Sequence, residues 1–428
     1  MSSPALPPTL PPALVTGVPG PASRALAVRL AAVESRNVTC LTPEAPIFWE
    51  RAQGANVWDV DGNRFVDLTG AFGVANVGHA HPRVTGAIAA QAETLLHAMG
   101  DVHPPRVKVD LLERLCALFP GGGEARAILG SSGADAVEAA LKTAMIATGR
   151  AGVVAFEGGY HGLGLGALDL TWRADFKAPF QGRLAHATSF ARYGDLDDVA
   201  RAASECPAPV AAVVVEPVQG RGGECIPPAG FLQALRERCD AEGWLLIADE
   251  IYTGFGRTGR MFACEHADVV PDLLCVGKGL SSGMPISACV GRAAVMDAWP
   301  ASAGEAIHTQ TFLGHPAGCA AALASIAVLE EFALAERTAA LGEKTLAWLR
   351  TAVAGRSTVR EVRGLGLMIG IECRTPEIAL AACRDALARG VVGLPSGDGG
   401  RVLSVTPPLA IGEDALRDAL SIVVDALS

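Results

Sequence analysis

Two short apolar segments end in residues whose side chains could carry chemistry. Residues 244–250 read Trp-Leu-Leu-Ile-Ala-Asp-Glu, and residues 272–276 are followed directly by Gly-Lys278-Gly. Because ligands of open α/β sheets bind outside the carboxyl ends of the strands, Asp249 stands where a site is expected. A lysine between glycines leaves room for a carbonyl compound, with which a neutral lysine amine forms a Schiff base. Taken separately, Asp249 is equally typical of a loop cap, and Lys278 of a solvated surface lysine.

Two further segments place a small-residue turn and an aromatic ring after strand-like runs. Residues 130–142 begin Gly-Ser-Ser-Gly-Ala-Asp and continue as a strongly helical sequence. Such a turn aims free N–H groups and the helix dipole at an anion, which makes Ser132, Gly133 and Ala134 candidates for binding a phosphate. By itself, a glycine turn most often only connects two elements. Tyr160 follows the next strand-like run, where its ring either stacks on a ligand or covers the end of the sheet.

Together, these four segments match what pyridoxal 5′-phosphate requires of a protein. A lysine holds the cofactor through a Schiff base, and a carboxylate keeps the pyridine nitrogen protonated so that the ring acts as an electron sink. The helix turn suits the phosphate, and the aromatic side chain suits the ring. We therefore expect an enzyme that uses this cofactor.

The sequence also resembles a known family, the class III pyridoxal-phosphate-dependent aminotransferases of fold type I, which include the 4-aminobutyrate, ornithine and omega-amine aminotransferases. The resemblance covers nearly the whole chain after residue 22, and its motifs are specific because they occur in order. The motifs are Val57-Trp-Asp-Val-Asp-Gly62, Gly78-His-Ala-His-Pro82, Ser132-Gly-Ala-Asp-Ala-Val-Glu138, Tyr160-His-Gly162, Val215-Glu-Pro-Val-Gln-Gly220, Asp249-Glu-Ile-Tyr-Thr-Gly-Phe-Gly-Arg-Thr-Gly259, Gly277-Lys-Gly279 and Thr311-Phe-Leu-Gly-His-Pro316.

The resemblance implies roles for the residues that react with or hold the cofactor. Lys278 would be the Schiff-base lysine and the proton shuttle, and Asp249 would pair with the pyridinium nitrogen. Tyr160 would stack on the cofactor ring. Ser132, Gly133 and Ala134 would bind the phosphate. Members of the family build their sites across a homodimer interface, and Thr311 of the neighbouring subunit would assist at the phosphate.

Three more residues receive supporting roles from the resemblance. Glu216 would be a carboxylate that supports the cofactor pocket. His161 would either support it as well or be a structural histidine. Tyr252 stands where relatives often have a glutamine, and its phenol would reach the cofactor's O3′.

The sequence departs from the family at three positions that concern the substrate. Members that use ω-amino acids with 2-oxoglutarate carry an arginine near the C-terminus and a glutamate that gates it. Ser404 stands at the arginine position, and Arg221 stands at the glutamate position. An arginine that often follows the aromatic-His-Gly motif is Leu163 here. Ordinary ornithine, acetylornithine or 4-aminobutyrate transamination is therefore in doubt.

Two hypotheses follow for the substrate. In the first, Arg221 offers its guanidinium fork to a substrate carboxylate and replaces the missing arginine. In the second, Arg221 points elsewhere and the pocket is apolar, favouring a hydrophobic amine or a long-chain amino donor. The apolar lining would then come from Phe48, Trp49, Phe72 and Leu163.

The leading prediction is an aminotransferase that works by a ping-pong cycle between a small-molecule amino donor and a keto acid. The alternative is a racemase, epimerase or aminomutase on the same fold, in which Lys278 moves a proton and no keto acid is consumed. A scaffold protein that retains the fold is disfavoured, because it has no need of Lys278 and Asp249 together.

The elements expected to position these residues alternate between short apolar runs and helix-like stretches. Apolar runs at 127–129, 152–156, 210–215, 244–248, 273–276 and 286–290 predict a mostly parallel, seven-stranded-type α/β sheet covered by helices. An Asp61-Gly62 turn predicts a hairpin within residues 56–68. We expect a Pro-rich disordered leader (1–22), the N-terminal part of a small domain (23–72), a large cofactor-binding domain (73–330) and the C-terminal part of that small α+β domain (331–428).

Composition excludes several other classes. The chain has 428 residues, and its formal net charge of −10 argues against a nucleic-acid partner, since such binding needs Lys and Arg to neutralise phosphates. No apolar run approaches the length of a membrane span, so no membrane association is expected. The eleven cysteines lack a CxxC pair, which favours reduced thiols in the cytoplasm. We expect no metal site.

Overall fold

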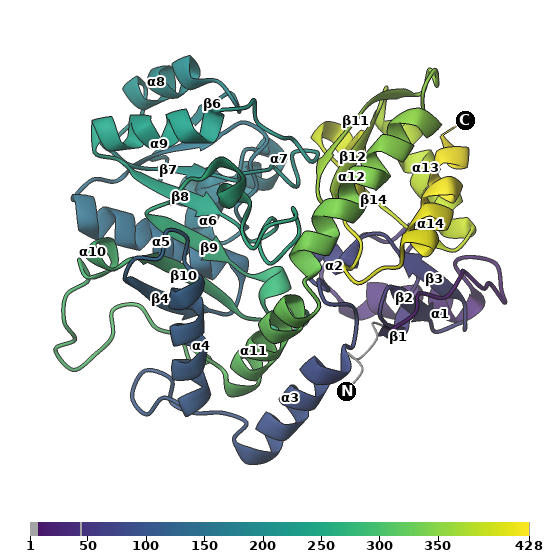
Figure 1. Ribbon diagram of the computed structural model, residues 1–428, viewed down its shortest axis with the longest axis horizontal. Helices are drawn as coiled ribbons and strands as arrows, with labels where there is room; N and C mark the ends of the chain where they lie inside the picture. The colour runs from purple at the N-terminus through teal and green to yellow at the C-terminus, as the bar shows by residue number, and fades with distance from the viewer. Residues whose placement is uncertain (1–6, 43–44, 428) are drawn as a thin grey trace.

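The computed structural model describes residues 7–42 and 45–427, which form a larger and a smaller lobe (Figure 1). The larger lobe contains a seven-stranded sheet, and two four-stranded sheets lie in the smaller lobe. In order across the large sheet, the strands are β4 (Ala125–Gly130), β10 (Ser287–Arg292), β9 (Leu273–Val276), β8 (Leu245–Asp249), β7 (Val210–Val215), β5 (Gly152–Phe156) and β6 (Thr188–Ala191). The predicted fold class is confirmed.

The large sheet is mostly parallel and is covered on both faces. Strands β9, β8, β7, β5 and β6 run parallel to one another, whereas β10 is antiparallel to both of its neighbours, β9 and β4. Alternate residues of β5 face opposite helix layers: Val153 packs in the cluster that contains α5, and Val154 packs in the cluster that contains α8 and α9. Burial on both faces explains why these strands are continuous runs of valine, alanine and isoleucine.

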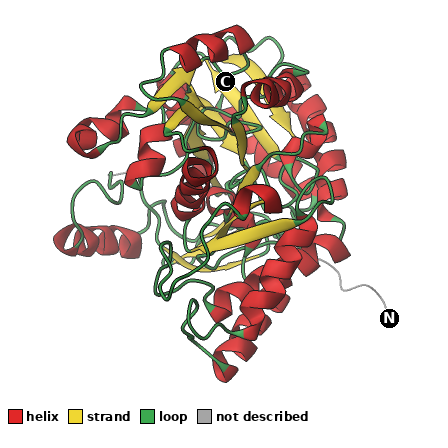
Figure 2. Ribbon diagram, turned by 90° about the vertical axis from the view of Figure 1, so that its left-hand side faces the viewer, coloured by secondary structure: helices red, strands yellow, loops and turns green. Residues whose placement is uncertain are grey.

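Helices flank the strands of this lobe (Figure 2). They are α3 (Pro82–Thr94), α4 (Arg106–Leu118), α5 (Gly133–Thr148), α6 (Leu165–Leu170), α7 (Ala174–Lys177), α8 (Leu196–Ser204), α9 (Phe231–Glu242), α10 (Ala293–Met296) and α11 (Pro316–Glu331). Among helices of the described residues, none has by itself the length and hydrophobicity of a membrane span. Helix α11 and the following helix α12 (Leu334–Ala352), bent by 61°, satisfy that criterion only as a pair.

Both ends of the chain build the smaller lobe. One sheet has the order β1 (Trp49–Gln53), β2 (Asn56–Asp59), β3 (Arg64–Asp67), β13 (Val391–Val392), and the other has the order β11 (Val359–Leu365), β12 (Met368–Cys373), β15 (Val402–Val405), β14 (Leu394–Ser396). Its helices are α1 (Pro21–Val33), α2 (Gly70–Gly73), α12 (Leu334–Ala352), α13 (Pro376–Ala388) and α14 (Glu413–Ala426). The parallel pairing of β3 with β13 joins the N-terminal and C-terminal parts of this lobe, whose purple and yellow-green segments form one lobe in Figure 1.

The N-terminal segment differs from the expected disordered leader. Residues 1–6 of that leader lie outside the described residues, but the backbone N–H of Leu10 donates to Asn56 and that of Val15 donates to Asn63. The predicted hairpin is confirmed as β2 and β3. Its asparagine side chains accept hydrogen bonds from the backbone N–H groups of the N-terminal segment, whose prolines prevent it from forming a helix or a strand ladder of its own.

Candidate active site

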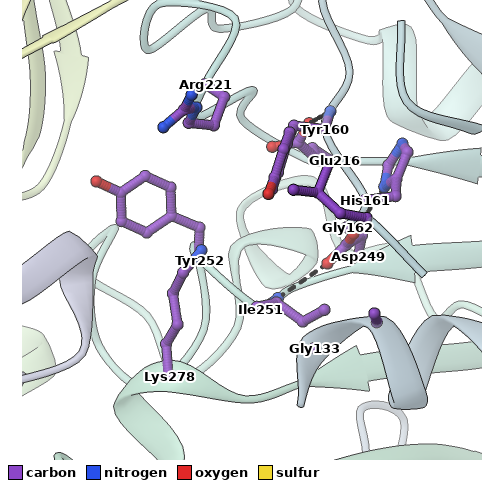
Figure 3. Close-up of a pocket in the computed structure, with 12 residues that line it drawn as sticks. Gly133, Tyr160, His161, Gly162, Glu216, Arg221, Asp249, Ile251, Tyr252 and Lys278 are labelled. Atoms are coloured by element: carbon purple, nitrogen blue, oxygen red, sulfur yellow. Dashed lines mark hydrogen bonds and ion pairs between the residues drawn. The ribbon is translucent and has the colours of Figure 1, made fainter. Parts of the chain in front are cut away.

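Two adjoining cavities open where β5, β7, β8 and β9 reach their carboxyl ends, and Figure 3 shows residues that line the first of them. The first, which we call the Asp249 cavity, has a volume of about 310 Å³. The second, the Ser404 cavity, has a volume of about 270 Å³. The two cavities share Tyr160, Arg221, Tyr252 and Lys278. Residues that are far apart in the sequence are thus brought to one edge of the sheet, as the rule for open α/β sheets predicts.

Asp249, the last residue of β8, is buried and held by two donors. The Nδ1–H of His161 donates to Asp249 Oδ2 over 2.7 Å, and the backbone N–H of Ile251 donates to Oδ1 over 3.1 Å. Burial by itself lowers the pKa of His161, but the hydrogen bond to Asp249 and the nearby carboxylates outweigh burial, so the pKa of His161 is raised. The raised pKa favours a protonated His161 that donates to the Asp249 carboxyl and fixes its orientation.

Lys278 enters the cavity from the turn that follows β9. Its φ of +42° is left-handed, and the neighbouring Gly279 has no room for a Cβ, which would lie 2.3 Å from the amide nitrogen of Asn76. Burial, partly opposed by the charges of Asp249 and Glu216, lowers the pKa of Lys278. In the described part of the chain, its Nζ has no hydrogen-bond acceptor or ion-pair partner, and it lies 4.2 Å from the centre of the Tyr252 ring.

The N-terminus of α5 borders the same cavity. Ser132 caps the helix in a reciprocal arrangement with Asp135, which satisfies the N–H groups of both residues. Gly133 and Ala134 line the cavity, and the described chain provides no acceptor for their N–H groups. A Cβ at Gly133 would lie 3.0 Å from Ile251, so the glycine lets the two elements approach each other. An anion is the natural ligand of such a helix terminus.

Glu216, at the end of β7, fixes the wall of the cavity. Its carboxylate accepts from the backbone N–H of Tyr160 (2.9 Å) and of Gly220 (3.0 Å). Burial raises the pKa of Glu216, while His161 and these N–H groups oppose the shift. The guanidinium of Arg221 lies over the ring of Tyr160, 5.3 Å from its centre. No carboxylate among the described residues pairs with Arg221.

Tyr252 stands between the two cavities. Its ring fits a slot between two glycines, since a Cβ at either Gly73 or Gly220 would lie 2.1 Å from a ring carbon. Its hydroxyl is 3.1 Å from Thr406 Oγ1, and in Figure 3 the hydroxyl points away from Asp249. The face of the ring, rather than the hydroxyl, therefore meets Lys278.

The structure brings some of the predicted substrate residues to the cavities and leaves others apart. Leu163 lines the Asp249 cavity, and Phe72 lines the Ser404 cavity, as does Ser404 itself. Phe48 and Trp49 are outside both linings; the Trp49 ring instead meets His79 edge-on. Thr311 lies in an exposed turn beside α5, where the neighbouring Gln310 accepts a hydrogen bond from Ser131.

Six residues that line the cavities were missing from the predicted site residues. Gly162 and Ile251 line the Asp249 cavity, and the Ser404 cavity adds Gly220, Glu224, Leu394 and Ser396. A signal for Glu224 was present in the sequence Arg221-Gly-Gly-Glu224. Arg221 replaces the family's glutamate there, and a carboxylate follows it three residues later. Ser396 lies on a short strand that the sequence pattern does not reveal.

Comparisons with known proteins identify the family. The sequence model of the family aminotransferase class III matches residues 40–427. The chain belongs to the class III aminotransferases. It is 40% identical to an acetylornithine aminotransferase of Methanopyrus kandleri, over 89% of this chain and 94% of the relative. It is 38% identical to a 4-aminobutyrate aminotransferase of Mycobacterium tuberculosis, over 97% of this chain and 98% of the relative.

Solved structures of this family resemble the aminotransferase over nearly its whole length. The ornithine aminotransferase of Toxoplasma gondii superposes with a TM-score of 0.87, at 31% identity over 95% of this chain and 94% of that one. An amine transaminase from an uncultivated Pseudomonas species, solved with pyridoxal phosphate bound, superposes with a TM-score of 0.82, at 31% identity over 92% of this chain and 97% of that one. The protein is thus a pyridoxal-phosphate-dependent transaminase that takes an amino donor and a keto acid.

The Asp249 cavity fits this cofactor. Within the described part of the chain, it combines a lysine amine without an acceptor, N–H groups without acceptors at the start of α5, and a buried carboxylate directed by His161. These are complementary to an aldehyde, a phosphate and a protonated ring nitrogen. Among the described residues, no cluster of three His, Cys, Asp or Glu side chains suits a metal ion.

Proposed function

We propose that Lys278 and Asp249 carry the chemistry of this aminotransferase. When bound, pyridoxal phosphate supplies an electron sink for the carbon that bears the amino group. Lys278 would hold the cofactor through Nζ and move a proton to and from that carbon, and the lowered pKa of Lys278 favours the neutral amine that accepts it. Asp249 would keep the ring nitrogen protonated. The observation that carries this proposal is that both side chains line one cavity.

The other lining residues would hold the cofactor in place. Gly133 and Ala134, whose N–H groups have no acceptor among the described residues, would bind its phosphate at the start of α5, and Ser132, whose own N–H donates to Asp135, would contribute its hydroxyl proton. Tyr160 would stack on the ring. Glu216 and His161 would act as positioning residues, because they fix the backbone of Tyr160 and the carboxylate of Asp249 respectively. Tyr252 would act on Lys278 through its ring.

We also propose that the amino donor carries a carboxylate that binds Arg221. The guanidinium lines both cavities, it rests on the Tyr160 ring, and among the described residues it has no carboxylate partner. A positioned guanidinium presents a planar fork that matches a carboxylate. The alternative, an apolar pocket, has support from Phe72 and Leu394 in the Ser404 cavity and from Leu163 and Ile251 in the Asp249 cavity, whereas Phe48 and Trp49 lie elsewhere.

Reversing the charge tests the role of Arg221. The cofactor's visible absorbance is followed after addition of an amino donor without keto acid, for donors with a carboxylate and for uncharged amines of the same length. In R221E, we expect kcat/KM for carboxylated donors to fall about tenfold to a hundredfold, with uncharged amines little changed. Unchanged turnover of carboxylated donors would show that Arg221 does not bind the donor's carboxylate. R29E, on the exposed side of α1, is the matched control.

We propose that the protein is a homodimer in the cytoplasm. Exposed apolar side chains gather where the segment after α3 meets the segment before α11, including Leu96, Met99 and Phe312, and the Phe312 ring lies 5.3 Å from that of His97. A contiguous apolar patch of this kind marks an interface, and Thr311 is next to it. The eleven cysteines are free thiols, seven of them buried, which suits a reducing compartment.

A further inference from the structure

The wall of the Ser404 cavity contains a buried acid that has no cation beside it. Glu224 is fully buried behind Ser404 and Ser396, whose exposed fractions are 3% and 8%. The hydroxyl of Ser404 donates to Glu224 Oε1 over 2.6 Å, and that of Ser396 donates to Oε2 over 2.8 Å. Among the described residues, no lysine, arginine or histidine nitrogen lies within ion-pairing distance of this carboxyl group.

The charged groups around Glu224 do not compensate a negative charge there. Arg363 favours the ionised form without forming an ion pair with it, and Glu216 disfavours that form. Tyr252 and Cys225 are the other titratable neighbours, and neither carries a positive charge. A buried carboxylate that lacks a cation takes up a proton instead. Burial accordingly raises the pKa of Glu224 to about 7, although both serine hydrogen bonds oppose the shift.

The surrounding backbone fixes this acid in the cavity wall. Glu224 has a φ of +50°, in the left-handed region that residues with a Cβ rarely adopt. On β12, Gly370 leaves the space that the side chain fills, because a Cβ there would lie 3.1 Å from Glu224 Oε2. Arg363 is held elsewhere, since it donates to the carbonyl of Gly223 and pairs with Glu372. A strained, fully buried acid in a cavity wall indicates a functional constraint.

The protonation state of Glu224 decides what the two serines present to the cavity. An ionised carboxylate only accepts, so the single proton of each hydroxyl is directed at Glu224 and the cavity meets serine lone pairs. A protonated carboxyl group has one O–H, which donates to one serine oxygen instead of accepting from it. That serine then turns its own proton to the cavity. The wall changes from an anionic surface of acceptors to a neutral surface with a hydrogen-bond donor.

Arg221 lines the same cavity, and among the described residues its guanidinium has no carboxylate partner. A substrate carboxylate there would be repelled by an ionised Glu224, whereas it would accept the hydroxyl proton that a protonated Glu224 releases. We propose that Glu224 takes up a proton from solvent when a carboxylated donor binds, and that Ser404 or Ser396 then donates to the substrate carboxylate beside Arg221. This inference rests on the proposed binding of the donor's carboxylate to Arg221. The serines are the contacting residues, and Glu224 is a positioning residue that acts through them.

Pairs of donors test the proposal in the holoenzyme. Two primary amines of one chain length carry a carboxylate or a methyl group at the far end, and the change in cofactor absorbance without keto acid gives kcat/KM for each. Titration of Lys278 or of the reacting amine affects both members, so it cancels in their ratio. For the wild type, we expect the carboxylate-to-methyl ratio to fall about tenfold from pH 6 to pH 8, as does the protonated fraction of a group with a pKa of about 7.

The failures of the two proposals are distinguishable in this experiment. A ratio that R221E lowers but that does not change with pH in the wild type would overturn the role of Glu224 and leave the role of Arg221 intact. A ratio that R221E leaves unchanged at pH 6 would overturn both. If no amine alters the cofactor absorbance, the proposed transamination itself is at fault.

Variants separate this role from a structural one. The side chain of glutamine is neutral at every pH, and its amide donates to a serine as the protonated acid does. In E224Q, we therefore expect the ratio to keep its wild-type value at pH 6 and to exceed the wild-type value about tenfold at pH 8. An equal loss of rate for both donors would mean a purely structural role and would overturn the proposal. E343Q, at an exposed position of α12, should keep the pH dependence of the wild type.

The serine hydroxyls are tested together. In the double variant S404A/S396A, we expect the ratio at pH 6 to fall about tenfold, because the hydroxyl proton that the substrate carboxylate accepts is missing. A ratio as high as that of the wild type would overturn the role of the serines.

Proton uptake provides a measurement that does not depend on turnover. The holoenzyme in weak buffer at pH 7.5 is mixed with a short straight-chain carboxylate that has no amino group, and an indicator dye reports the protons that are bound. We expect the wild type to take up as much as about three quarters of a proton per site, the ionised fraction of a group with a pKa of about 7, and E224Q to take up none. Binding of the carboxylate without proton uptake would overturn the proposal.

Discussion

Burial shifts the pKa values of two titratable residues in this site in opposite directions. For Lys278 it lowers the pKa, which favours the neutral amine that the chemistry needs. For Glu224 it raises the pKa to about 7, although the Ser404 and Ser396 hydrogen bonds oppose the shift. Both residues owe these shifts to the cavity wall rather than to their neighbours in the sequence.

The raised pKa of Glu224 predicts a pH dependence of stability. An unfolded glutamate has a pKa near 4.5, so between that pH and about 7 the folded state binds more protons than the unfolded state. The contribution of Glu224 is therefore largest below pH 4.5 and is lost as pH rises to about 7. Relative to the wild type, E224Q should gain up to about 3 kcal/mol of unfolding free energy across this window.

Denaturant unfolding at a series of pH values measures this difference. Glu343, an exposed glutamate on α12, provides the matched control E343Q, which should follow the wild type at every pH. A constant difference between E224Q and the wild type from pH 4.5 to 8 would contradict the expected titration.

At the scale of elements, side chains from distant segments accept hydrogen bonds from backbone N–H groups for which the local sequence provides no acceptor. Helix α1 has no side-chain cap of its own, since its N-cap is Gly20. Asp61, in the hairpin turn between β2 and β3, accepts instead from the N–H groups of Ala22 and Ser23 and from the Ser23 hydroxyl. One carboxylate thus caps a helix about forty residues away in the chain and attaches α1 to the hairpin.

Removing this distant cap should destabilise the smaller lobe. In D61N, the amide keeps one acceptor oxygen but cannot accept from all three donors as a charged group does. We expect a loss of about 1 kcal/mol, the usual cost of a lost N-cap. Thermal unfolding of the holoenzyme measures it, with D418N, at an exposed position of α14, as the control. Equal unfolding temperatures for the two variants would show that Asp61 does not stabilise α1.

At the scale of the whole molecule, the site depends on contacts between lobes. Arg257, fully buried, donates to the carbonyl oxygens of Leu367 and Pro407 and to the side chain of Asn76. The same Asn76 leaves no room for a Cβ at Gly279, beside Lys278. The smaller lobe contributes Ser396 and Ser404 to the cavity. The lysine turn and the substrate wall are therefore positioned by the packing of one lobe against the other.

The proposed dimer gives a prediction at the same scale. Introducing a charge in F312E should break the association of the apolar patch, because the glutamate would be buried against a second copy of that surface. We expect the mass measured by light scattering to fall from dimer to monomer. F180E, at another exposed phenylalanine, should stay dimeric. If F312E and the wild type have the same mass, this patch is not the interface.

The sequence by itself determined the elements and residues that can be recognised from a short stretch of the chain. Apolar runs at 152–156, 210–215 and 273–276 coincide with β5, β7 and β9, because strands buried on both faces need continuous apolar residues. The strand ends then indicated Asp249, Lys278 and Tyr160, which do line one cavity. The family and its cofactor followed from the same motifs.

Only the tertiary structure decided what surrounds those residues. Strand β6 is short and only partly buried, so Thr-Ser-Phe-Ala carries no clear periodicity, and its place is set by pairing with β5. Glu224, Ser396 and Ser404 come from three separate segments, and their hydrogen bonds exist only once the lobes meet. Side-chain direction, as for Arg221 over Tyr160, depends on such contacts between segments, which spacing along the chain does not encode.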